Sequence, residues 1–137
     1  MNTILPAAHF TIAYGCVLVA ALLPIACSAL AKYGNGGAKP FDNNDPRGWL
    51  ARQTDWRARA NAAQANSFEA LPFFIGAVII AHQLGAAQMP LDMLALLFIL
   101  LRLLYIMMYV AGLPTVRSLV WTGGLLVNIG ILFLGYR

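Results

Sequence analysis

Two sets of polar side chains interrupt otherwise apolar sequence, and their residue types could bind a charged ligand. They are Arg59, Asn66 and Glu69, followed by Arg102, Tyr105 and Tyr109. The first set is spaced by seven and three residues and the second by three and four. Residues at these spacings share one face of a helix. Guanidinium, carboxylate, amide and phenol groups on facing helices suit a polyanionic or peptide-like ligand.

The two sets lie at matching depths when residues are counted from the turn between them. Glu69 comes 13 residues before His82, and Tyr105 comes 13 residues after Asp92. At a rise of about 1.5 Å per residue, both are about 20 Å from the loop around Gln83–Pro90. Two antiparallel helices joined by this loop would therefore bring the two polar faces opposite each other.

The sequence that carries these residues is typical of a membrane protein. It is 61% hydrophobic and only 10% charged, whereas soluble domains are about 45–50% apolar and about 25% charged. Four apolar segments are each close to the roughly 20 residues that span a bilayer: about Ala8–Ala31, Ala60–His82, Leu91–Gly112 and Leu119–Tyr136. Because a lipid-exposed backbone must form its own hydrogen bonds, these segments are expected to be helices.

We therefore predict a single domain over residues 1–137, an all-α integral membrane protein built as a four-transmembrane-helix bundle. The second helix is expected to start outside the hydrocarbon, as an extension of its apolar segment. The predicted helices and the polar loop after the first of them lie at about 8–31, 47–83, 90–112 and 115–136, and at 32–46.

Basic residues gather on one side of this predicted bundle. Nine of the 14 charged residues lie between Lys32 and Arg59, while the loop around Gln83–Pro90 has no basic residue. The positive-inside rule places the first loop and the connection near Pro114–Arg117 in the cytoplasm, with both termini on the other side. In a bacterium this would be the inner membrane. Topology and anionic lipids account for the net charge of +4, so no nucleic acid partner is predicted.

The buried charges allow two interpretations on the residues alone. A charge at the bilayer centre costs about 2.5–3.5 kcal/mol, so Glu69 and Arg102 could form an ion pair that only fixes helix register. A ligand site is the other interpretation, because more donors are present than one carboxylate can use. The additional groups belong to Asn66, Tyr105, Tyr109, Arg59 and Arg117.

Other residues are interpreted structurally. Trp121 is expected to anchor the bundle at the membrane interface. Gly123, Gly124 and Gly130 would allow close helix approach, and Asn128 would hydrogen-bond across helices. The sequence has no glycine-rich phosphate loop, no serine elbow and no metal-spaced Cys/His cluster, so no metal is predicted.

The sequence resembles the MAPEG family, the membrane-associated proteins in eicosanoid and glutathione metabolism. The match includes the family's Arg…Asn-x-x-Glu-x-x-Pro signature and extends over the whole chain in length, helix number and motif order. It is carried by Arg59, Asn66, Glu69 and Pro72, by Arg102, Tyr105 and Tyr109, and by Pro114, Arg117 and Ser118. Many members have an arginine at the position of Ala62 and an aromatic residue at that of Ala70.

The resemblance implies a homotrimer that binds glutathione, as co-substrate, between neighbouring subunits near the cytoplasmic side. It implies that Arg117 stabilises the glutathione thiolate, which attacks a lipophilic electrophile from the membrane lipids or reduces a lipid peroxide. The glutathione-binding residues that it implies are Arg59, Asn66, Glu69, Arg102, Tyr105 and Tyr109.

Two other functions stay open at this point. A small four-helix transporter usually needs an acidic residue in its first helix, whereas here the first apolar segment has none and Glu69 is the only deep carboxylate. A non-catalytic membrane scaffold would use the Glu69–Arg102 pair only to set assembly.

Overall fold

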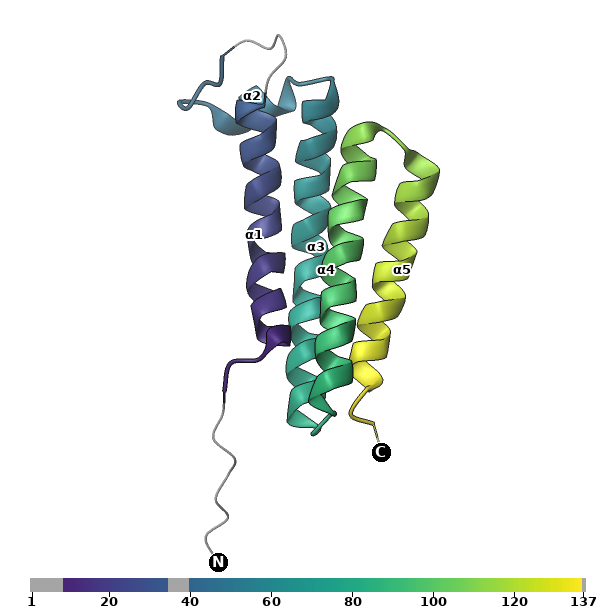
Figure 1. Ribbon diagram of the computed structural model, residues 1–137. Helices are drawn as coiled ribbons and strands as arrows, with labels where there is room; N and C mark the ends of the chain where they lie inside the picture. The colour runs from purple at the N-terminus through teal and green to yellow at the C-terminus, as the bar shows by residue number, and fades with distance from the viewer. Residues whose placement is uncertain (1–8, 35–39, 137) are drawn as a thin grey trace, which may run out of the picture.

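Four long antiparallel helices form the molecule, which is described for residues 9–34 and 40–136 in a computed structural model. A short fifth helix lies near one end, in the connection between the first two of them (Figure 1). The helices are α1 (Ile12–Tyr33), α2 (Pro46–Ala51), α3 (Trp56–Gln83), α4 (Gln88–Ala111) and α5 (Pro114–Phe133). All four long helices have the length and apolar composition to cross a membrane. The fold is therefore that of an all-helical, multi-pass membrane protein.

The expected single helix over 47–83 is wrong, because the chain breaks between α2 and α3. Two aspartates each begin a new helix as N-caps. Asp45 accepts a hydrogen bond from the Gly48 N–H at 3.0 Å, and Asp55 accepts one from the Arg57 N–H at 2.9 Å. The cap at Asp55 therefore starts the membrane-spanning helix afresh.

The other predicted boundaries differ from the structure by a few residues. α1 begins at Ile12, after Thr11 caps it by accepting from the Tyr14 N–H at 3.2 Å, and residue 8 lies outside the described residues. α4 starts at Gln88 and α5 ends at Phe133. Part of the predicted polar loop, residues 35–39, also lies outside the described residues.

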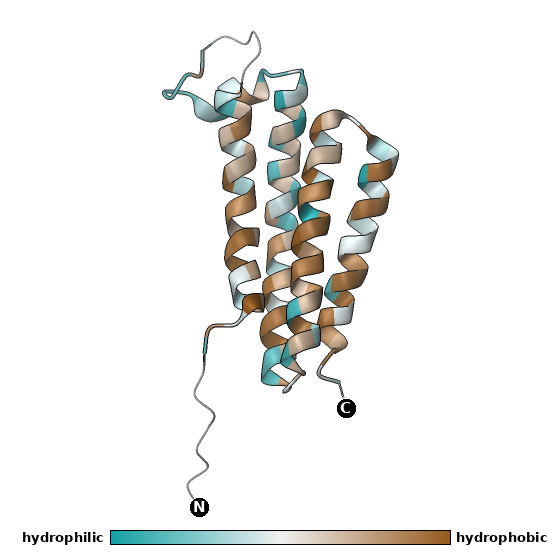
Figure 2. Cartoon of the chain, viewed as in Figure 1, coloured by the Kyte–Doolittle hydropathy of each residue, from teal (hydrophilic) through white to brown (hydrophobic). Residues whose placement is uncertain are grey.

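Small buried residues let the helices approach closely. On α1 these include Ala13, Cys16 and Ala20, which pack against Ala77 and Ala81 of α3 in one core. In lipid, such small side chains favour close helix packing because backbones gain van der Waals contact. Figure 2 shows hydrophobic residues along all four long helices, while the hydrophilic residues of α3 gather in its half nearest α2 and at its last turn.

In the half of the bundle away from α2, aromatic stacking and a side-chain hydrogen bond connect the helices. The rings of Phe74 and Phe98 stack with centroids 4.2 Å apart. Asp92 on α4 accepts a hydrogen bond from the Ala13 N–H at 2.8 Å. Ala13 lies in the first turn of α1, where backbone N–H groups have no partner within the helix and the helix dipole favours a negative charge. These contacts connect α1, α3 and α4. The polar residues of α3 lie in its other half, beside α4 and α5.

Candidate functional site

A buried arginine lies at the centre of the polar half of the bundle. Arg102 on α4 is 4% exposed. Both of its Nη atoms donate to Asn66 Oδ1 at 3.1 Å, and Nη2 also donates to Ser67 Oγ at 3.1 Å. Within the described residues there are two ion pairs, and neither includes Arg102. Its positive charge is therefore held inside an apolar helix by neutral groups alone.

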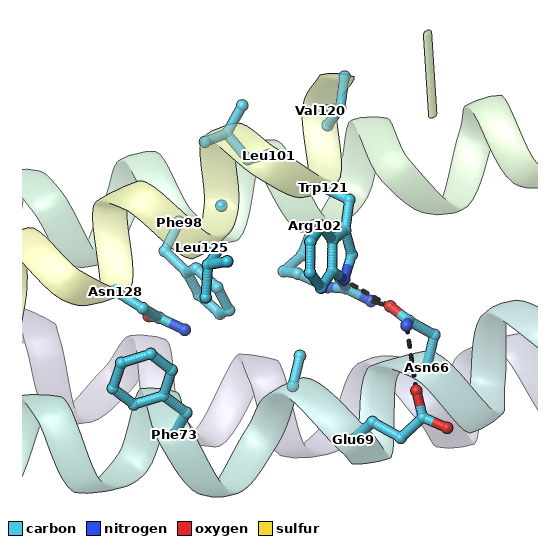
Figure 3. Close-up of a pocket in the computed structure, with 12 residues that line it drawn as sticks. Asn66, Glu69, Phe73, Phe98, Leu101, Arg102, Val120, Trp121, Leu125 and Asn128 are labelled. Carbon is cyan, nitrogen blue, oxygen red and sulfur yellow. Dashed lines mark hydrogen bonds between the residues drawn. The ribbon is translucent and has the colours of Figure 1, made fainter. Parts of the chain in front are cut away.

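Asn66 stands between this arginine and the nearby carboxylate. Its Nδ2 donates to Glu69 Oε2 at 3.2 Å while its Oδ1 accepts from Arg102 (Figure 3). The direct Glu69–Arg102 ion pair, one of the two interpretations of the sequence, is therefore wrong. Asn66 faces α4, and Glu69, one turn later on α3, is exposed at the edge of the bundle.

Two tyrosine rings between two arginines form a row of contacts from Arg102 to the start of α5. The Arg102 guanidinium lies 4.3 Å from the centroid of the Tyr105 ring, and that of Arg117 lies 4.3 Å from the Tyr109 ring. The two rings meet edge to face with centroids 5.6 Å apart. Cation–π contacts of this kind orient a guanidinium without neutralising its charge.

The turn between α4 and α5 brings Arg117 into this row. Gly112 ends α4 with φ 76°, a left-handed conformation that glycine adopts without strain. Pro114 then begins α5, where its missing N–H has no cost. Arg117 consequently lies in the first turn of α5 and folds back against Tyr109.

Two cavities meet at these residues. A polar cavity of about 450 Å³ is lined by Asn66, Tyr105, Tyr109, Arg117, Ser118, Trp121 and Thr122. A smaller one, of about 150 Å³, lies between α3, α4 and α5 (Figure 3). Asn66 and Trp121 line both, while Glu69 and Arg102 line the smaller. The polar cavity is within the range of volumes that hold small organic ligands.

Arg59 is the predicted site residue that the structure places apart. Its Nε donates to the Val110 carbonyl at 2.9 Å, so it ties α3 to the last turn of α4. It lines neither of the two cavities described above. Asn66, Glu69, Arg102, Tyr105, Tyr109 and Arg117 are brought together, as the facing helical patterns predict.

Three residues of this region were missed or misread from the sequence. Ser67 bonds Arg102 directly, and its position beside Asn66 on α3 was the available signal. Trp121, expected to be an interfacial anchor, forms a wall of both cavities. Asn128 was expected to hydrogen-bond across helices, but its buried Oδ1 has no hydrogen-bond partner.

The described ranges contain no group of three His, Cys, Asp or Glu residues that could hold a metal ion. The polar groups that line the two cavities include guanidinium, amide, phenol and hydroxyl groups. Such a set can bind carboxylates and peptide groups and can stabilise an anion.

The fold and the site define an integral membrane protein of four spans, with a polar cavity between its last three helices. The chain belongs to the MAPEG family, whose model matches residues 12–136 and so confirms the resemblance seen in the sequence. The search of curated proteins and the search of solved structures found no match. Family membership associates this membrane protein with glutathione or eicosanoid metabolism.

Proposed function

We propose that the protein uses glutathione to modify lipophilic electrophiles or to reduce lipid peroxides. The observation that carries this proposal is the burial of Arg102, whose guanidinium has neutral hydrogen-bond partners and lines the smaller cavity. A cation at membrane depth is costly, and it usually pairs with another charge or a carbonyl or faces a water-filled cavity. Glutathione brings two carboxylates and a thiol that can ionise, so it can supply an anionic partner.

The polar groups suit the different parts of glutathione. A guanidinium has five N–H donors, and Arg102 uses three of them within the chain. The Nε–H and one Nη1–H remain, and either can donate to a carboxylate. The Asn66 amide can bond a peptide group. The exposed Glu69 carboxylate can pair with the glutathione ammonium, and the phenols of Tyr105 and Tyr109 complete the polar wall.

Arg117 is the residue that we assign to the chemistry. A free thiol has a pKa of about 8.5, and a fixed guanidinium favours the thiolate. Lowering that pKa by about 2 makes the thiolate dominant at pH 7 and corresponds to about 2.7 kcal/mol of differential interaction. In conjugation the thiolate forms a C–S bond as the leaving group departs with its electron pair. In peroxide reduction the thiolate sulfur attacks the terminal oxygen, the O–O bond breaks, and the lipid alkoxide leaves and is protonated to the alcohol. The resulting glutathione sulfenic acid condenses with a second glutathione to give disulfide and water.

The assembly and the orientation belong to the same proposal. Phe68, Glu69 and Pro72 are exposed on one face of α3, which suits a homotrimer in which glutathione binds between subunits. The basic residues around α2 favour a cytoplasmic position for that end, with both termini on the opposite side and, in a bacterium, an inner-membrane location.

The structure supports the two alternative functions, scaffold and transporter, less well than the glutathione function. A scaffold that depends on a direct Glu69–Arg102 pair lacks that pair, because Asn66 separates the two groups. A proton-coupled transporter would depend on Glu69, and it would lose drug uptake in vesicles on Glu69→Gln substitution.

The proposal is tested on the protein purified in detergent. We expect saturable glutathione binding by calorimetry and conjugation of glutathione to an aryl halide above the uncatalysed rate. Arg52→Ala is a matched control, because Arg52 is an exposed arginine paired with Asp45 at 3.2 Å, away from both cavities. Absence of both binding and turnover in the wild-type protein would reject the proposal.

A further inference from the structure

Two hydrogen-bond acceptors hold the Arg102 guanidinium, and they constrain it differently. Both Nη atoms donate to Asn66 Oδ1 at 3.1 Å, so this oxygen lies at the end of the guanidinium fork and does not distinguish Nη1 from Nη2. Rotation about the Nε–Cζ bond keeps both distances to an acceptor in that position. The Tyr105 ring, 4.3 Å away, attracts the charge as a whole and selects no single N–H. A further contact is therefore needed to fix the plane of the guanidinium.

Ser67 supplies that contact. It follows Asn66 on α3 and is 5% exposed. Its Oγ donates to the Ala63 carbonyl at 2.8 Å and accepts from Nη2 of Arg102 at 3.1 Å. A serine hydroxyl has one proton, and because Ala63 takes it, only oxygen lone pairs face the arginine. The hydroxyl is therefore held as a neutral acceptor for one of the two Nη atoms.

We propose that Ser67 is a positioning residue, which acts through Arg102 to set the direction of the N–H groups that remain for an anionic ligand. These are the Nε–H and one Nη1–H, and Arg102 lines the smaller cavity. Because the Ser67 oxygen is neutral, it orients the guanidinium without cancelling the charge that attracts a carboxylate. The inference rests on the proposed function where it takes glutathione as the ligand, whereas the orientation of Arg102 belongs to the protein alone.

The space around Ser67 decides which variants test this role. A cavity of about 10 Å³ borders Ser67 and Arg102, about the least space that one water molecule occupies. Ser67→Ala would leave room for a water molecule that replaces the hydroxyl. Threonine and valine are both β-branched and have similar helix propensities, and valine has a methyl group where threonine has the hydroxyl. Ser67→Thr and Ser67→Val therefore form a matched pair that differs in the hydroxyl.

The first measurement is nitrogen-15 NMR of the arginine side chains in the detergent-solubilised protein without glutathione. The Arg102 signals are those that Arg102→Met lacks. In the wild-type protein and in Ser67→Thr, Nη1 and Nη2 should give separate signals that exchange slowly. Ser67→Val should exchange them about tenfold faster, the effect of one lost hydrogen bond. Equal exchange rates in the two variants would overturn the positioning role.

Glutathione calorimetry on the same samples measures the consequence for binding. Ser67→Thr should bind glutathione as the wild-type protein does, and Ser67→Val should bind it severalfold more weakly, because the free N–H groups are no longer held in one direction. A packing defect would weaken binding in both variants, since both carry the added methyl group. If Ser67→Val does not fold, Ser67→Cys takes its place, because a thiol is only a weak acceptor.

The two measurements separate this inference from the proposed function. Arg102 exchange that depends on the hydroxyl at position 67, in a wild-type protein that does not bind glutathione, overturns only the glutathione function. Glutathione binding with equal affinities or equal exchange rates in Ser67→Thr and Ser67→Val overturns only the role of Ser67.

Discussion

Two arginines in this molecule are almost equally buried but are neutralised differently. Arg57, at the junction of α2 and α3, is 3% exposed and pairs with Asp55 at 2.7 Å and with the Gly34 carbonyl at 3.0 Å. Arg102, between α3 and α4, is 4% exposed and bonds only the neutral Asn66 and Ser67 among the described side chains. The first charge is paired with a carboxylate within the chain, whereas the second has neutral hydrogen-bond partners among the described residues.

The local sequence explains the difference. A cation in the first turn of a helix opposes the helix dipole, and Asp55 offsets this for Arg57 by acting as both N-cap and counter-ion. Arg102 has no acidic residue within a turn on α4. Its Asn66 partner orients the guanidinium without cancelling its charge. A buried arginine with neutral partners beside a cavity is thus a better indication of a ligand site than burial alone.

The largest effect is expected from removing the charge that lacks an anionic partner. Arg102→Met should weaken glutathione binding about 100-fold, because a charge-assisted hydrogen bond contributes about 1.5–3 kcal/mol. The thermal unfolding temperature should stay the same or rise, since an apolar side chain replaces a buried cation. Calorimetry and thermal unfolding in detergent measure the two quantities. Unchanged glutathione affinity in a folded variant would remove Arg102 from the site.

Arg117 should affect the rate more than the binding. Arg117→Ala is expected to lower turnover tenfold or more, and to move the rise of the pH–rate profile to higher pH, because the thiol would ionise less readily. The rate of glutathione conjugation as a function of pH measures both. With Arg52→Ala as the control, wild-type turnover in the Arg117→Ala variant would disprove the role in thiolate stabilisation.

Removing the internally paired arginine should give the opposite result to removing Arg102. Arg57→Met should lower the free energy of unfolding by about 1–2 kcal/mol, because it loses hydrogen bonds to the Gly34 carbonyl and to Asp55, whose side chain is partly exposed. Glutathione affinity should be unchanged. Chemical denaturation in detergent and calorimetry test this, and a loss of glutathione affinity would erase the distinction between the two arginines.

The smallest effect concerns the protonation of Asp55. The Arg57 N–H that donates to this carboxylate, followed by the Arg57 charge, lowers the pKa of Asp55 below its usual value. A lowered folded-state pKa gives stability that is present above the unfolded pKa and is lost as the pH falls through the folded one. The unfolding temperature should therefore decrease below about pH 4, and less so in Asp55→Asn, which keeps a cap but cannot titrate. Equal acid sensitivity in both proteins would contradict this.

The sequence predicted the spans and the facing polar residues, because both depend on periodicity. Four apolar runs defined the helices, and the spacing of Glu69 and Tyr105 put them at one depth. It did not predict the break at Asp55, since this residue lies in the polar stretch before the apolar segment starts at Ala60, where hydropathy does not mark a helix boundary. It also did not show that Asn66 separates Glu69 from Arg102, because spacing assigns a face and a depth but not a bonding partner.

The sequence did not predict the two cavities or which residues line them. Trp121 and Asn128 were interpreted from residue type alone, as an interfacial anchor and a cross-helix hydrogen-bonding group. Their place in the cavity walls depends on how α5 packs against α3 and α4. Helix packing of this kind follows from the fit of many side chains at once, which a periodic pattern does not contain.

Whether Arg102 and Arg117 hold an ionised glutathione is tested most directly by the ultraviolet absorbance of the thiolate. Glutathione is added to the purified protein at about pH 7, well below the usual thiol pKa of about 8.5. We predict thiolate absorbance that grows and saturates with binding, and that is lost in Arg117→Ala while glutathione still binds. Saturable glutathione binding without thiolate absorbance in the wild-type protein would contradict the assignment of these arginines.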